Sequence, residues 1–147
     1  MKAEAKSLRF LGESNKLSVP FFQRHYVWTE ENWEELLISL EGTDVTPFLG
    51  SLILKELSGL EFLIIDGQQR LTTTFLIIYA IKQLLVNCND TEKVKQLEGQ
   101  YLTNPYHNDK IKYKLKPLVS DDDVYRCIVE DRMGDITDKE SNVLKNY

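Results

Sequence analysis

The sequence predicts a single α+β domain built around one central helix. Strand-like runs at residues 49–55 and 60–65 flank Gly59, which supplies the dihedral angles of a short antiparallel hairpin. The second run leads into residues 68–87, which are apolar on nearly every side and therefore predict a helix buried in the core. A further helix is predicted at 29–42, where apolar residues recur with amphipathic spacing.

Length and composition indicate one globular domain over residues 1–147, with 42% apolar and 28% charged residues. Because the net charge is −5, any contact with nucleic acid must depend on a local basic patch. The two cysteines lie far apart and predict neither a disulfide framework nor a zinc site, which favours a reducing, cytoplasmic location. The longest apolar run is too short for a bilayer span, so no membrane partner is expected.

The elements before the hairpin follow from two local signals. Residues 17–21 are mostly apolar and include Pro20, which cannot donate to a ladder, so they predict a short edge strand that runs into a loop. Thr29 is then the expected N-cap of the amphipathic helix, with acids in its first turn and Gly42 at its end.

The second half of the chain predicts shorter elements. A capping-box pattern at Thr137 and Glu140 begins a helix that the chain leaves unfinished, so we expect the natural protein to continue. The other predicted elements are a polar helix at 91–100, a loop at 101–109, a strand at 110–115 and a helix at 120–131.

The most informative stretch joins the apolar strand to the central helix. The strand ends in Asp66, Gly67 permits a sharp turn, and the first helical N–H groups attract an anion. Arg70 adds a bidentate cation, and Gln68 and Gln69 can face a ligand or an attacking water. Asp66 could hold a metal or orient Arg70. The alternative is structural: Asp66 caps the helix and Arg70 pairs with a neighbouring acid.

A second group of polar and aromatic side chains lies at residues 19–28. It predicts either a loop that faces the junction or a surface loop whose aromatics pack on the core and whose Arg24 pairs with Glu30 or Glu31. Neither histidine of the chain is expected to serve as a nuclease base.

Four lysines recur at every second position and are expected to project from one face of a strand: Lys110, Lys112, Lys114 and Lys116. They predict either a basic ridge that binds a nucleic-acid backbone or a solvated face that protects a strand edge.

Two signatures carry a resemblance to a known family. Residues 66–73 read D-G-Q-Q-R-L-T-T, and residues 20–28 fit P-x-x-Q-R-x-Y-x-W. Both resemble the N-terminal domain family of GmrSD-type, modification-dependent restriction endonucleases, and the order of elements over about 8–131 agrees. The resemblance implies a ParB/sulfiredoxin-like fold, a small mixed sheet with flanking helices in which a strand-to-helix turn holds a nucleotide phosphate.

The same resemblance implies roles for individual residues. Asp66, Gln68 and Gln69 would be catalytic, with Asp66 as a Mg²⁺ ligand or an orienting carboxylate and the glutamines on phosphate or water. Arg70 would be the main phosphate ligand. The other residues of the nucleotide site would be Gly67, Thr72, Thr73 and Tyr26, with Gln23 and Arg24 closing it from the facing loop.

Two functions remain open from the sequence. The first is a domain that binds and hydrolyses a nucleoside triphosphate in a prokaryotic phage-defence endonuclease acting on modified or foreign DNA. In that case a separate C-terminal His-Asn-His nuclease domain, in cis or in trans, would cut the DNA. The second is a module that recognises modified DNA or its phosphate backbone without a nucleotide. An interaction scaffold whose motif only caps a helix is the third alternative.

Overall fold

The computed structural model describes residues 4–14, 16–41, 48–104, 112–139, 141–145 and 147. Its first elements are α1 (Arg9–Glu13), β1 (Lys16–Ser18), α2 (Glu30–Glu41), β2 (Ile53–Ser58), β3 (Glu61–Asp66) and α3 (Gln68–Asn87). They are followed by α4 (Thr91–Leu97), a π-helical segment (Glu98–Leu102), β4 (Leu115–Lys116), α5 (Val119–Val129), a 3₁₀ turn (Met133–Asp135) and α6 (Asn142–Lys145).

The strands form a mixed sheet in the order β2-β3-β1-β4. β2 and β3 make the predicted antiparallel hairpin, and Gly59 in its turn has a φ of 57°. β1 pairs in parallel with both β3 and β4, so the prediction of an edge strand for this segment is wrong. Pro20 does not forbid an interior position, because β1 ends at Ser18 and the ladder needs no N–H from the proline.

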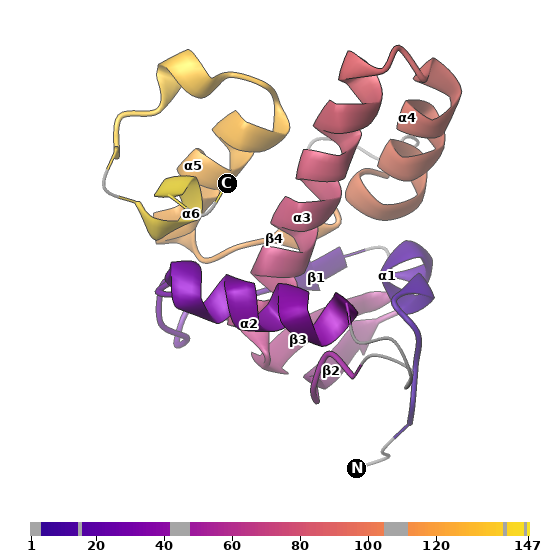
Figure 1. The fold of residues 1–147 in the computed structure, drawn as a ribbon. Helices are drawn as coiled ribbons and strands as arrows, with labels where there is room; N and C mark the ends of the chain where they lie inside the picture. The colour runs from indigo at the N-terminus through magenta and orange to yellow at the C-terminus, as the bar shows by residue number, and fades with distance from the viewer. Residues whose placement is uncertain (1–3, 15, 42–47, 105–111, 140, 146) are drawn as a thin grey trace.

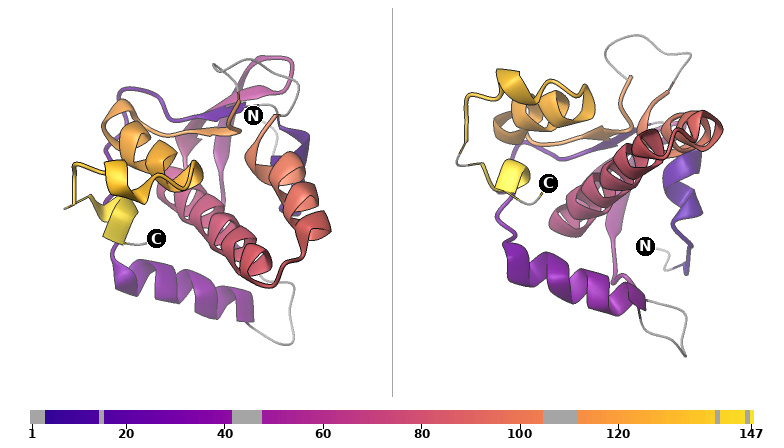
Figure 2. Two further views of the ribbon diagram at one scale, coloured as in Figure 1. Left: turned by 90° about the horizontal axis from the view of Figure 1, so that it is seen from above. Right: turned by 45° about the horizontal axis from the view of Figure 1, so that its top comes forward.

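α3 is the central helix that the sequence predicts, and its bounds agree with the prediction. Figure 1 shows it running between α4 on one side and the α5–α6 segment on the other, and Figure 2 shows the same arrangement. The buried apolar residues of α3 lie between its first turn and Tyr79, and Lys82 is buried beyond them, whereas Ile81, Leu84 and Val86 near the end are exposed. The apolar core contacts of α3 are therefore concentrated in its N-terminal part.

The flanking helices match the prediction less closely. α2 lies at the periphery and buries only Leu36, and the Gly42 expected at its end lies outside the described residues. α5 agrees with the predicted helix to within two residues.

No helix in the described part of the chain combines the length and apolarity that crossing a bilayer requires. The small α+β fold with a mixed sheet and flanking helices is confirmed.

The predicted lysine stripe is broken at Lys114. Its side chain is buried, at 4% exposed, and its ammonium donates to the carbonyls of Gly12 at 2.5 Å and Gln100 at 2.8 Å. Lys112 and Lys116 are exposed, while Lys110 lies outside the described residues. The expectation of a common face is wrong because the strand comprises only two residues, so the period of two does not extend through the segment.

Lys114 is consequently expected to support the fold rather than to bind DNA. Lys114→Met should lower the free energy of unfolding by about 2 kcal/mol or more, because buried carbonyls lose a charged donor. Urea denaturation measures the change. Lys116→Met, which removes the same charge at an exposed position of β4, is the matched control. Equal stabilities of the two variants would contradict this role.

Candidate functional site

The junction between β3 and α3 has the sharp turn that the sequence predicts. Gly67 adopts φ 89° and ψ 13°, in the left-handed region that favours glycine. A Cβ added to Gly67 would also collide with the side chain of Leu52. Both the dihedral angles and the close approach of the chain before β2 therefore require a glycine here.

The N-terminus of α3 carries no side-chain cap. Its first backbone bond runs from the Leu71 N–H to the Gly67 carbonyl at 3.0 Å, so the N–H groups of residues 68–70 precede the helical hydrogen-bond ladder. Asp66 is exposed, and its carboxylate accepts no hydrogen bond from the described residues. The alternative in which Asp66 caps the helix is therefore not observed, and the helix end keeps its partial positive charge.

Arg70 lies against backbone rather than against an acid. Its Nη1 donates to the Ser51 carbonyl at 3.3 Å, and its guanidinium carbon would lie 2.6 Å from a Cβ added to Gly50. Gly50, with a φ of 91°, thus makes room for the guanidinium. Within the described residues Arg70 forms no ion pair, so the predicted alternative of a neighbouring acidic partner is not found there.

The two glutamines of the junction hold the facing loop, residues 23–28. Gln69 Oε1 accepts from the N–H groups of Val27 at 2.8 Å and Trp28 at 3.3 Å, and its Nε2 donates to the His25 carbonyl at 3.1 Å. Gln68 Nε2 donates to the Arg24 carbonyl at 2.5 Å. The structure therefore brings the two signatures together through side-chain to backbone hydrogen bonds.

These contacts give Gln69 a structural role in addition to the predicted one. A carboxamide oxygen has two lone pairs, and both are directed at loop N–H groups, so the oxygen is occupied, while the amide nitrogen uses one of its two N–H groups on the His25 carbonyl. Gln23 is engaged in a similar way, because its Nε2 donates to the Ile65 carbonyl at 2.8 Å. Both residues position the loop at the end of β3.

Tyr26 and Thr73 also have structural contacts, which join the facing loop to α3. The Thr73 hydroxyl donates to the Gln69 carbonyl at 3.0 Å, and it accepts from the Tyr26 hydroxyl at 2.7 Å. Both side chains are buried in the core. Of the residues predicted to bind the nucleotide, Arg24, Tyr26 and Thr72 line a small cavity beside the helix.

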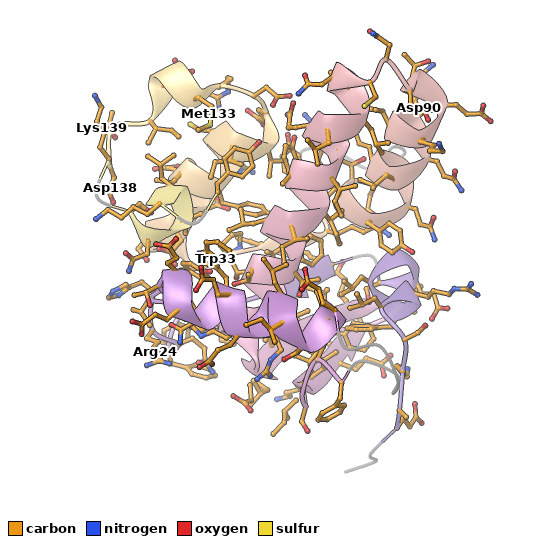
Figure 3. All side chains as sticks on the ribbon, in the orientation of Figure 1. Arg24, Trp33, Asp90, Met133, Asp138 and Lys139 are labelled. Carbon is orange, nitrogen blue, oxygen red and sulfur yellow. The ribbon has the colours of Figure 1, made fainter. Side chains whose placement is uncertain are left out.

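The cavity has a volume of about 10 Å³ and lies between the facing loop, α3 and the start of α5. Arg24 is exposed and lies at the edge of the molecule beside the start of α2 (Figure 3), and no ion pair joins it to Glu30 or Glu31. Arg24 is thus both an exposed residue and part of the cavity wall. Asp121 of α5 forms part of its wall.

Asp121 is a site residue that sequence reasoning missed. The acids at the start of α5 predict only a favourable interaction with the helix dipole. In the structure the Asp121 Oδ2 accepts from the Tyr26 N–H at 2.8 Å, and burial raises the pKa of its carboxyl. The sequence does show three consecutive aspartates at 121–123, but nothing in it indicates which of the three is buried.

Disruption of the Gln69 contacts should loosen the facing loop. Gln69→Leu leaves the Val27 N–H without an acceptor, so we expect a loss of about 2 to 3 kcal/mol in the free energy of unfolding and faster hydrogen exchange at Val27. Gln96→Leu, at an exposed position of α4, is the control. Unchanged exchange at Val27 would show that Gln69 does not hold the loop.

The buried carboxyl predicts a pH dependence of stability. A carboxyl with a raised pKa binds its proton more tightly in the folded state, so its contribution to stability falls as the pH rises from the ordinary carboxyl range through the raised value. Asp121→Asn should therefore gain stability relative to the natural protein between about pH 4 and pH 7. Urea denaturation at both pH values measures this, with Asp123→Asn at an exposed position as the control. A gain that is equal at both pH values would contradict the effect.

Comparison with known proteins agrees with the family that the two signatures resemble. One similar protein, an uncharacterized protein of Methanocaldococcus jannaschii, is 32% identical over a match that covers 44% of this chain. The match spans only 15% of that relative's length. The family model described as the GmrSD restriction endonuclease, N-terminal domain, matches residues 8–147. The chain therefore belongs to the GmrSD N-terminal domain family, a domain associated with restriction endonucleases.

Proposed function

We propose that the β3–α3 junction binds the phosphates of a nucleoside triphosphate. The observation that supports this most is the Arg70 guanidinium, which is held by a backbone carbonyl and has no carboxylate partner among the described residues. It stands in the first turn of a helix whose leading N–H groups lack a side-chain cap. An arginine fork and helix amides together are the usual protein ligands of a phosphate group.

The family gives this binding a context. For the longer protein we propose that nucleotide binding and hydrolysis license DNA cleavage by a separate His-Asn-His nuclease domain, in a prokaryotic cytoplasmic defence against phage DNA. The membership of the chain in a restriction-endonuclease domain family supports an association with DNA. Cleavage itself is proposed for the longer protein alone, because the chain matches a short part of its relative.

Asp66 is the residue at the junction that fits Mg²⁺. Mg²⁺ commonly binds through one or two carboxylates together with substrate phosphates, and Asp66 is an exposed carboxylate at the strand end. The described residues contain no cluster of three or more acidic, histidine or cysteine ligands, so the phosphates would have to complete the coordination. Bound Mg²⁺ would neutralise phosphate charge, while Arg70 and the helix amides orient the nucleotide.

Binding of DNA without a nucleotide has less support. The prediction of DNA binding was based on four lysines that share one face of a strand. The side chain of Lys114 is instead buried, and its ammonium donates to main-chain carbonyls. The exposed Lys112 and Lys116 leave a much smaller basic surface in the described residues. We therefore retain this function only as an outcome to be tested.

Calorimetric titration with the four nucleoside triphosphates and Mg²⁺ tests the proposal. Arg70→Gln should weaken nucleotide binding about tenfold or more, because phosphate loses its bidentate cation. Asp66→Asn should retain most of the binding and lose phosphate release, since the carboxylate is proposed to act through the metal ion. Arg9→Gln, at an exposed position of α1, is the matched control for Arg70.

The same titration separates the alternatives. Failure of all four nucleotides to bind would contradict the proposal. Binding of DNA oligonucleotides that falls steeply with salt and is unaffected by added nucleotide would favour the DNA module.

A further inference from the structure

The chain segment before β2, residues 50–52, packs directly on the β3–α3 junction. Ile53, which follows the segment, pairs with Asp66 across the hairpin, so the sheet holds the segment beside the turn. Leu52 lies so close to Gly67 that a Cβ on the glycine would collide with its side chain. Because the hairpin register and this contact both fix the segment, it forms one wall of the proposed phosphate site.

Gly50 in this wall faces the guanidinium of Arg70. A Cβ added to Gly50 would lie 2.6 Å from the guanidinium carbon and 2.7 and 3.0 Å from Nη1 and Nη2. An atom beyond the edge of the group would be nearer to a nitrogen than to the carbon, so these distances place Gly50 over the flat face. The φ of Gly50 is 91°, which also favours glycine.

The contacts of Arg70 leave most of the guanidinium edge open. A guanidinium carries five N–H donors in its plane, and among the described residues only the Ser51 carbonyl accepts from them, at 3.3 Å. The contact of the face with Gly50 uses no N–H group. Arg70 is thus held from its face and from one corner, and an oxyanion can accept from two of the remaining donors.

We propose that Gly50 is a positioning residue for Arg70 in phosphate binding. The inference rests on the proposed function, because it assigns to Gly50 the orientation of the proposed phosphate ligand. The absent side chain lets the guanidinium lie flat against the backbone with its donor edge exposed. An alanine methyl needs a carbon–carbon distance of about 3.5 Å, so it would displace the guanidinium by about 1 Å.

Titration of Gly50→Ala with the four nucleoside triphosphates and Mg²⁺ tests this role. Each nucleotide that binds the natural protein should bind the variant about tenfold more weakly, because a displaced cation no longer meets the phosphate with two N–H groups. Gly59→Ala is the matched control. Gly59 also has a positive φ, of 57°, but a Cβ there meets no atom within 4 Å, so this variant should bind as the natural protein does.

Backbone strain at Gly50 is the alternative cause of weaker binding, and Arg70→Lys separates the two. A lysine keeps the charge but has no planar group to lie against Gly50. In the Arg70→Lys protein, Gly50→Ala should therefore change the affinity by less than about twofold. An equal loss in both backgrounds would overturn the proposal, because the alanine would then act through the backbone. Gly50→Asn adds the same Cβ with less strain, since asparagine tolerates a positive φ, and should weaken binding as alanine does.

A measurement without nucleotide follows the guanidinium itself. The Arg70 Nε–Hε signal in a ¹H–¹⁵N spectrum is assigned by its loss in Arg70→Gln. It should shift in Gly50→Ala and keep its position in Gly59→Ala, because only the first variant touches the guanidinium. An unshifted signal in Gly50→Ala would overturn the proposal.

The outcomes separate this inference from the proposed function. Nucleotide binding that Arg70→Gln weakens and Gly50→Ala leaves unchanged would overturn the role of Gly50 and keep the phosphate site. Failure of every nucleotide to bind the natural protein would overturn both.

Discussion

The hydrogen bonds between the carboxamide of Gln69 and the backbone of residues 25–28 are the constraint on which the rest of the site depends. They satisfy part-buried main-chain groups of the loop, and they attach the loop to the first turn of the central helix. The cavity wall follows from this attachment, because it places Tyr26 where its N–H reaches Asp121. One side chain thus joins the loop, α3 and α5.

The first turn of α3 divides its polar residues among different tasks. Successive residues of a helix point about 100° apart, so Arg70 points away from the side on which the glutamines lie. Gln68 and Gln69 both hold the facing loop and line the cavity, whereas Arg70 lies beside Gly50. A run of polar residues that suggests one catalytic cluster in sequence is therefore distributed around the helix. Only part of the signature remains free for a ligand.

Local signals predicted the hairpin, the turn at Gly67 and the bounds of α3, because dihedral preference and apolar periodicity act over a few residues. The interior position of β1 was not predictable in this way, since it depends on pairing with β4 about a hundred positions later. The prediction that Lys114 lies on an exposed basic face was wrong for the same reason, because its ammonium donates to carbonyls of other segments of the chain. Asp121 was missed because burial distinguishes it from its neighbours, and burial is a property of the packed chain.

By itself the sequence determined which polar residues occur at the strand-to-helix turn and that a glycine must bend the chain there. The tertiary structure decided which of those side chains are occupied, since that depends on partners 41 to 44 positions away. Gln68 Nε2 and Gln69 have such partners in the facing loop, whereas within the described residues Arg70 donates to the Ser51 carbonyl and Asp66 accepts no bond. Each side chain can make only a limited number of hydrogen bonds. The glutamines that hold the loop therefore have less capacity left for a ligand than Arg70 and Asp66.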